Sequence, residues 1–135
     1  MGEIAYSETL EGVEPAHLGC FFVGWPQRPS AERHLAMLRG SDHVVLARDG
    51  QRVVGFVTAV SDGVLSAFIP LLEVLPEYQG RGIGTELMRR MLARLESLYM
   101  VDLCCDAELE PFYARLGLGT LDRGMGLRNS RAIPG

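Results

Sequence analysis

Runs of apolar residues in the middle of the chain predict a series of antiparallel strands. The runs at 44–48 and 53–60 are separated by Asp49-Gly50, a dipeptide that is typical of tight hairpin turns. The next run, 65–75, is almost entirely apolar, which indicates a strand that is covered on both faces. Pro70 lies within this run and has no N–H to donate to a ladder, so we expect a bulge or bend there. Further strands are predicted at residues 3–8 and 100–105.

A second kind of apolar spacing predicts helices. The clearest stripe repeats at i, i+4 and i+8, and it consists of Ile83, Leu87, Met88, Met91, Leu92, Leu95 and Leu98. The side chain of Ser30 can accept a hydrogen bond from a backbone N–H, so we expect it to begin a short helix that stops at Gly40. Two further segments, 10–22 and 110–116, are expected to be helical, and 118–128 is expected to form a terminal hairpin.

The length and composition of the chain fit one ordinary globular domain. A chain of 135 residues can bury one core, so we expect a single domain over 1–135. Hydrophobic residues make up 47% of the chain and charged residues 22%, which is far from the composition of disordered proteins. Apolar runs such as 53–57 are much shorter than the roughly 20 residues that a membrane span requires. The acidic start at Glu3 is atypical of signal and transit peptides, so we expect a cytoplasmic protein without a membrane partner.

The basic residues narrow the possible chemistry, because all 13 of them are arginine. The absence of lysine excludes Schiff-base and pyridoxal enzymes, and it excludes the nucleotide-hydrolase loop whose lysine contacts the phosphates. A formal net charge of −4 argues against binding to nucleic acid or anionic membranes. The charge favours cationic partners instead.

The cysteines and histidines suggest no metal centre. Cys20, Cys104 and Cys105 are odd in number and two of them are adjacent, which suits neither a disulfide framework nor spaced zinc ligands. We therefore expect reduced thiols, with Cys104 and Cys105 as small core residues, and we expect no metal. The histidines match no catalytic pattern and are interpreted as surface or helix residues; they are His17, His34 and His43.

A glycine-rich segment, 79–85, lies between the apolar strand and the strongest predicted helix. This order of elements directs backbone N–H groups and the positive helix end toward an anion, usually a phosphate. A dinucleotide fingerprint would need a third glycine at position 85, where the chain has Thr85. The segment can wrap a pyrophosphate with N–H groups and Arg81, or its glycines can serve only tight packing.

Two motifs in this region give the chain a family resemblance. Residues 74–84 resemble the acetyl-coenzyme A motif of the GNAT superfamily of N-acetyltransferases, Gln/Arg-x-x-Gly-x-Gly/Ala, with Gln79, Gly82 and Gly84 at its defined places. Residues 112–118 resemble a second signature, Tyr-x-x-x-Gly-Phe, with Leu118 in place of phenylalanine. The resemblance covers nearly the whole chain and is closest to small bacterial members. It implies a mixed α/β sheet of six to seven strands with about four helices.

The resemblance also implies acetyl-CoA as co-substrate and a set of residues that bind it. In the family, the strand before the loop and the strand after the helix splay apart, and pantetheine lies in the gap. The backbone of Leu72 and Val74 is then expected to pair with pantetheine, and Asp106 is expected near it. The residues expected around the pyrophosphate are Gln79, Gly80, Arg81, Gly82, Ile83, Gly84 and Thr85.

The implied reaction is direct transfer of an acetyl group to a primary amine in a ternary complex. It implies the N–H of Val74 as oxyanion donor and Tyr113 as general acid, although Tyr113 can instead pack its helix on the core. Glu73 is the one acid in an apolar strand, so it is our candidate base, directly or through water. The alternatives are that Glu73 pairs with an arginine and that Asp106 is the base.

The acceptor is less defined by the sequence. Phe21, Phe22 and Trp25 can line a pocket for a small amine, or they can belong to the core. A non-catalytic acyl-CoA-binding sensor or interaction module is the alternative to an enzyme, because no histidine or glutamate precedes Leu71 in the apolar strand. A homodimer is expected by analogy only.

Overall fold

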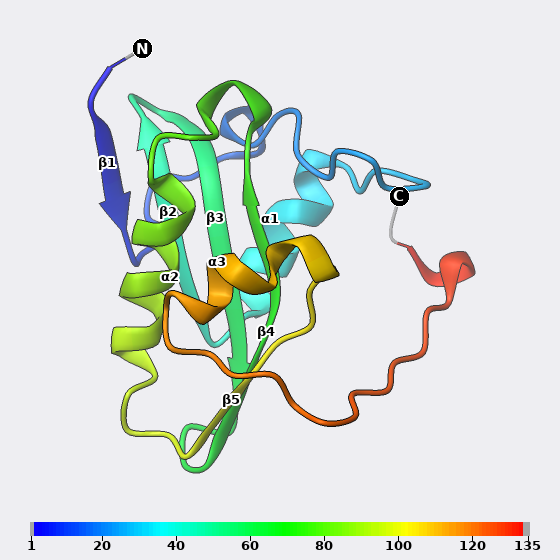
Figure 1. The fold of residues 1–135 in the computed structure, drawn as a ribbon. Coiled ribbons are helices and arrows are strands. Elements are labelled where there is room, and N and C mark those ends of the chain that lie inside the picture. Colours follow the sequence, from blue (N-terminus) through cyan, green and yellow to red (C-terminus); the bar gives the residue numbers. More distant parts are fainter. Residues whose placement is uncertain (1, 134–135) are drawn as a thin grey trace.

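A mixed sheet with the strand order β1-β2-β3-β4-β5 organises this computed structural model, which describes residues 2–133 (Figure 1). The first four strands pair antiparallel and the fifth pairs parallel to the fourth. The strands are β1 (Ile4–Ser7), β2 (His43–Asp49), β3 (Arg52–Ser61), β4 (Ser66–Val74) and β5 (Met100–Asp102). The sheet supplies much of the core, because residues 44–47 of β2 and 53–59 of β3 are all buried.

The helices are α1 (Ala31–Gly40), α2 (Ile83–Arg94) and α3 (Glu110–Ala114), and they cover the sheet on both faces (Figure 1). A Cβ added at Gly55 of β3 would lie 3.1 Å from Leu87 of α2, so this residue faces α2. The next residue, Phe56, faces the other way and packs against His34 of α1. Short 3-10 turns connect these elements: η1 (Pro15–His17), η2 (Pro76–Tyr78), η3 (Ala107–Leu109) and η4 (Ser130–Ala132).

Several sequence predictions are confirmed. The hairpin of β2 and β3 turns at Asp49-Gly50, where Gly50 has the positive φ of +62° that such a turn needs. The side chain of Ser30 accepts a hydrogen bond from the N–H of Arg33 and so caps α1. The apolar stripe of α2 is buried, including Leu87, Met88 and Met91 at 0% exposure.

The bulge expected at Pro70 is also present. The β3–β4 register pairs Thr58 with Leu71 and Val60 with Phe68. Two residues of β4, Ile69 and Pro70, therefore lie opposite a single residue of β3. The extra residue accommodates the proline without breaking the ladder on either side.

The count of elements was overestimated, because the described residues form five strands and three α-helices rather than six to seven and about four. Segment 10–22 is not a helix and contains only the turn η1. Gly12 has a φ of +77°, and Cys20 and Phe22 also have positive φ values, which a right-handed helix cannot include. Its apolar side chains are nevertheless buried: Val13, Leu18, Phe21 and Phe22.

The predictions for the C-terminal third were wrong in two places. The strand expected over 100–105 ends at Asp102, where pairing with β4 stops, so Cys104 and Cys105 are exposed rather than core residues. The terminal hairpin expected over 118–128 is absent from this described segment, whose residues are almost all exposed. A strand needs a partner and packed side chains, and glycines at 119, 124 and 126 weaken this one further.

Candidate active site

The pairing between β4 and β5 covers only the first part of β4. It begins at Ser66 with Met100 and ends at Phe68 with Asp102. The strand β4 continues to Val74, with β3 along one edge and no strand of the described chain along the other. The two parallel strands thus separate, and a stretch of β4 edge is left open between them.

The hydrogen-bonding groups on this open edge follow from the register of β3 and β4. The N–H of Leu75 donates to the carbonyl of Val54 over 2.9 Å, which makes these two residues a hydrogen-bonded pair. Because such pairs alternate along an antiparallel ladder, the N–H and C=O groups of Leu72 and Val74 point away from β3. The side chain of Gln79 donates to the carbonyl of Val74 over 3.0 Å, in agreement with this direction. Both groups of Leu72 and the N–H of Val74 therefore face the open edge.

The glycine loop follows β4 directly and leads into α2. Gly80 and Gly82 have φ values of +77° and +82°, a conformation that side chains disfavour. A Cβ added at either position would meet nothing within 4 Å, so the surface of the loop is open. No side chain in the described part of the chain caps the N-terminus of α2 at Gly82, and the first helical bond runs from the N–H of Glu86 to the carbonyl of Gly82. The N–H groups of residues 83–85 precede that bond and have no partner within the helix.

Contacts of Tyr78 anchor the loop to the β2–β3 hairpin. Its hydroxyl donates to a carboxylate oxygen of Asp49 over 2.6 Å. This hydrogen bond is the largest cause that raises the pKa of Tyr78 and lowers the pKa of Asp49. The guanidinium of Arg81 lies over the Tyr78 ring at 5.5 Å, and Arg52 forms an ion pair with Glu77 at 3.0 Å. The ring of Tyr78, in the turn η2, thus helps to position the guanidinium of Arg81 within the loop.

Tyr113 lies in α3, which packs on the first turn of α2. A Cβ added at Gly84 would lie 3.6 Å from the ring of Phe112 and 3.8 Å from Val74. The ring of Tyr113 packs edge-on against Phe112 at 4.9 Å and is partly buried. Burial raises the pKa of Tyr113, and the nearby Cys105 raises it further. The phenol therefore keeps its proton at neutral pH.

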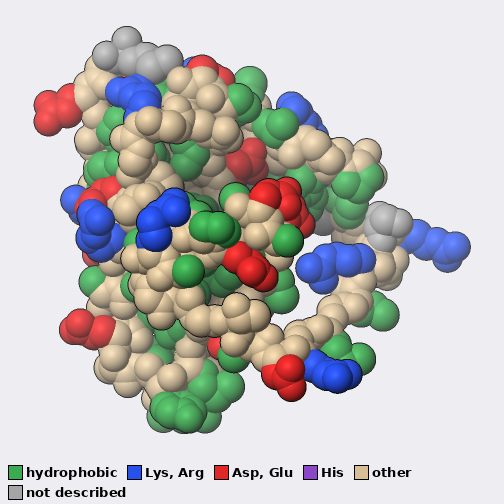
Figure 2. All heavy atoms as spheres, in the orientation of Figure 1, with side chains coloured by type: hydrophobic (Ala, Val, Ile, Leu, Met, Phe, Trp, Pro, Cys, Tyr) green, Lys and Arg blue, Asp and Glu red, His purple; other side chains and the backbone are tan. Residues whose placement is uncertain are grey.

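Asp106 lies just before the turn η3 and is exposed. Burial and the charges of Glu110 and Asp106 raise the pKa of Cys105. Figure 2 shows acidic side chains around α3 and basic side chains over the start of α2. The thiol of Cys105 is thus kept protonated beside Tyr113.

Glu73 makes contacts that the sequence did not predict. One carboxylate oxygen accepts the N–H of Phe22 over 2.9 Å and the other accepts the N–H of Val23 over 3.3 Å. The partners of Glu73 are thus two successive backbone N–H groups and not an arginine. Phe22 has a φ of +63°, which is rare for a bulky residue and is held here by the carboxylate and by burial of its ring.

The aromatic segment, residues 21–25, lies partly in the core and partly on the surface. Phe21 and Phe22 are 3% and 1% exposed, and Trp25 is 40% exposed and packs edge-on against Phe22. Both buried rings contact His34, which is only 1% exposed. The burial of His34 was not predicted, although its spacing from Leu38 and its place next to Leu35 put it on the apolar face of α1.

The comparisons with known proteins fit this geometry. Residues 10–118 match the model of the Acetyltransferase (GNAT) family, so the chain belongs to this family. A crystal structure from Deinococcus radiodurans R1, of a protein assigned as an acetyltransferase, is 49% identical with a TM-score of 0.92 and covers 98% of this chain and 94% of that one. The match confirms the GNAT fold. Family membership implies acetyl-CoA as the co-substrate.

Curated relatives differ in the acceptors that their names give. Histone acetyltransferase TAP1 of Glycine max is 30% identical over 73% of this chain and 48% of its own length. The chloroplastic serotonin N-acetyltransferase 2 of Oryza sativa subsp. japonica is 34% identical over 81% of this chain and 58% of its own length. The chain spans about half the length of these curated relatives. Among residues 2–133, no helix is long and apolar enough to cross a membrane.

Proposed function

We propose that this chain transfers the acetyl group of acetyl-CoA to the primary amine of a small molecule, by direct attack in a ternary complex. The observation that carries the proposal is the open edge of β4, which runs straight into the glycine loop and the uncapped start of α2. An extended arm that contains amides can pair with such an edge, and a pyrophosphate is stabilised by free N–H groups at a helix start. The open edge of β4 fits the pantetheine arm of coenzyme A, and the glycine loop with the start of α2 fits its pyrophosphate.

The donor-binding residues follow from this arrangement. In the proposed complex, the backbone of Leu72 and Val74 pairs with the pantetheine arm, and Asp106 lies near it. Residues 79–85 surround the pyrophosphate, because Gly80 and Gly82 have no side chains to keep the backbone from the phosphates.

The reaction requires a base, a hydrogen-bond donor to the oxyanion and a general acid from the chain. Bound acetyl-CoA supplies a thioester whose carbonyl carbon is attacked by the amine nitrogen. Glu73 accepts the proton that this nitrogen loses, directly or through water, and the N–H of Val74 donates to the carbonyl oxygen as it becomes negative. As the C–S bond breaks, Tyr113 gives its phenolic proton to the departing thiolate. A proton then returns to Tyr113 from Glu73 through solvent, which leaves the N-acetylated amine and the coenzyme thiol.

The surroundings of Glu73 support its role as the base. Each carboxylate oxygen accepts one N–H bond, and each has a second lone pair for an incoming proton. The same two bonds fix the carboxylate against the loop of Phe22 and Val23. A fixed base is productive because its position relative to the amine is set before the reaction.

A small-molecule acceptor agrees with the aromatic segment that Glu73 holds. The names of two curated relatives give a histone and serotonin as acceptors. The second candidate, a non-catalytic acyl-CoA sensor, is favoured by one observation: both oxygens of Glu73 are already engaged by the backbone. Glu73 would then have only a structural role.

A coupled assay separates the two candidates. Coenzyme A binding is measured by calorimetry, and thiol release is measured with acetyl-CoA and a panel of small primary amines. Saturable thiol release with at least one amine, together with the acetylated product in a mass spectrum, supports the transferase. Coenzyme binding with no release above the rate in water, for every amine, supports the sensor.

A further inference from the structure

The imidazole of His34 is buried without any hydrogen-bond partner for its two nitrogens among the described residues. It lies among the rings of Phe21, Phe22 and Phe56, at centroid distances of 5.2, 4.9 and 4.4 Å. Leaving a buried polar group unpaired costs about 1–3 kcal/mol, which folded proteins rarely tolerate without a reason. Both nitrogens of His34 are thus left unsatisfied by residues 2–133 and are able to bind an external polar group.

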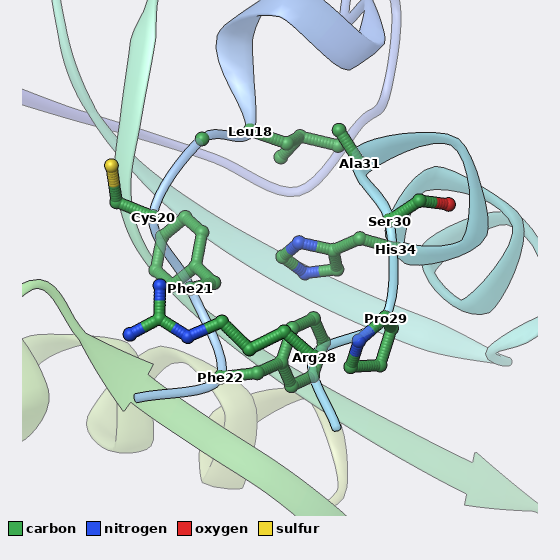
Figure 3. Close-up of a pocket in the computed structure, with 10 residues that line it drawn as sticks. Leu18, Cys20, Phe21, Phe22, Arg28, Pro29, Ser30, Ala31 and His34 are labelled. Atoms are coloured by element: carbon green, nitrogen blue, oxygen red, sulfur yellow. The ribbon is translucent and has the colours of Figure 1, made fainter. Parts of the chain in front are cut away.

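A cavity of about 120 Å³ lies directly beside this imidazole. Figure 3 shows the His34 ring projecting from α1 into the space between Leu18 and Ala31 on one side and Phe22 and Pro29 on the other. The exposed residues among those that line the cavity, through which it opens to solvent, are Gly19, Cys20 and Arg28. The volume corresponds to about four water molecules or to one aromatic ring with a small substituent.

The chemistry of the cavity selects for a neutral group. Burial lowers the pKa of His34 to about 4, so at neutral pH the ring has one N–H donor and one acceptor nitrogen and no charge. Most of the remaining wall is apolar. A hydroxyl group matches this environment, because it donates one hydrogen bond and accepts another while its carbon framework packs on Leu18 and Phe22.

The cavity shares the residue Phe22 with the candidate base, Glu73. Phe22 lines it, and the N–H of the same residue donates to Glu73. Phe56 contacts His34 and is the register partner of Glu73, so the carboxylate and the imidazole lie on the same face of the sheet. Glu73 and His34 therefore both adjoin Phe22 and Phe56.

From this placement we propose that the cavity holds the far end of the acceptor, and that the acceptor is an amine with a hydroxyl group remote from its nitrogen. The inference rests on the proposed function. The amine lies at Glu73 and the hydroxyl exchanges hydrogen bonds with the imidazole of His34. Arg28 at the opening disfavours the opposite orientation, in which the cationic amine would enter first.

Two amines that differ only by a hydroxyl test the proposal: tyramine and phenethylamine. We expect kcat/KM for tyramine to exceed that for phenethylamine by about tenfold or more in the wild-type protein, because an unpaired imidazole disfavours the latter. His34→Leu should reduce the preference to within about twofold, mainly by loss of tyramine turnover, and His34→Gln, which keeps a donor and an acceptor, should retain part of it. A ¹⁵N spectrum of the imidazole gives a readout that does not depend on turnover. Its resonances should shift with tyramine and not with phenethylamine.

The outcomes of this experiment distinguish a failure of the hydroxyl site from a failure of the proposed transferase function. Equal turnover of both amines without an imidazole shift overturns the hydroxyl site and leaves the transferase intact. An imidazole shift with tyramine in a protein that acetylates no amine supports the site and overturns the function. No imidazole shift and no turnover of tyramine, in a protein that acetylates other amines, also overturns the hydroxyl site.

Discussion

Glu73 and Phe22 are 51 residues apart in the chain, and a hydrogen bond of 2.9 Å from the N–H of Phe22 to the carboxylate of Glu73 joins them. This bond links β4, where the donor arm is proposed to lie, to the aromatic segment where the acceptor is proposed to lie. A change at Glu73 is therefore expected to affect both the chemical step and the shape of the loop.

Glu73→Gln is expected to lower kcat by about a hundredfold or more, because an amide cannot accept the amine proton. The variant should also lose about 1–3 kcal/mol in the free energy of unfolding, since the new NH₂ group faces a backbone N–H. Thiol release and urea unfolding measure the two effects. Glu77→Gln is the control, because it removes a neighbouring carboxylate whose ion pair with Arg52 is largely exposed. A loss of stability with unchanged kcat would mean that Glu73 only positions the loop.

Tyr113→Phe is expected to reduce kcat by about ten- to a hundredfold, because the thiolate then leaves without a proton donor. The ring keeps its contact with Phe112, so the unfolding free energy should change little. Tyr99→Phe is the matched control, since Tyr99 is 85% exposed and far less packed. If Tyr113→Phe keeps wild-type kcat across the pH range, Tyr113 is not the acid and only packs its helix.

Gly82→Ala tests the phosphate loop, with Gly50→Ala as its counterpart in the β2–β3 turn. The φ values are +82° and +62°, and a Cβ meets nothing within 4 Å at either position. Each alanine should therefore cost about 1–2 kcal/mol of stability through backbone strain alone. Only Gly82→Ala should weaken coenzyme A binding by calorimetry, by about tenfold or more, because its Cβ points into the proposed phosphate site. Equal coenzyme affinity in both variants would falsify the assignment of this loop.

The stability of the protein should depend on pH through His34. Its pKa is lowered to about 4 from an ordinary value of 6.5, so the unfolded chain binds the proton more readily than the folded chain does. The contribution of the neutral ring is complete above pH 6.5 and is lost as the pH falls toward 4, by at most about 1.4 kcal/mol per pH unit. Urea unfolding of the wild type and His34→Leu at pH 7 and pH 4.5 measures this loss. The gap between the two should change by about 1–3 kcal/mol in favour of the variant at the lower pH, and parallel curves would contradict the assignment.

Most of the correct predictions came from local turn and helix patterns. The dipeptide Asp49-Gly50 was sufficient to predict the β2–β3 hairpin. The apolar residues of α2 repeat regularly enough to define one buried face of the helix. The family motifs then indicated which elements lie beside the loop. For these features the information lies within a few neighbouring residues.

The incorrect predictions concern segments whose conformation is set by distant contacts. The positive φ of Phe22 depends on Glu73 and on the buried ring cluster, so no local pattern at 10–22 could reveal it. The strand expected to reach Cys105 stops at Asp102, where its pairing with β4 ends. The pocket at His34 arises from α1 and the segment before it together, and only the spacing of His34 along the helix gave a signal.

The unpaired edge of β4 has a consequence for the protein before it binds any donor. Exposed strand edges can pair with edges of other molecules, and this is a common route to aggregation. The bulge at Pro70 interrupts the first part of the edge, but residues 71–74 remain regular and apolar apart from Glu73. In the proposed complex the pantetheine arm occupies these groups in the way that a sixth strand would. Coenzyme A would then act as a solubilising partner, and the purified chain should remain monodisperse longer when the coenzyme is present during storage.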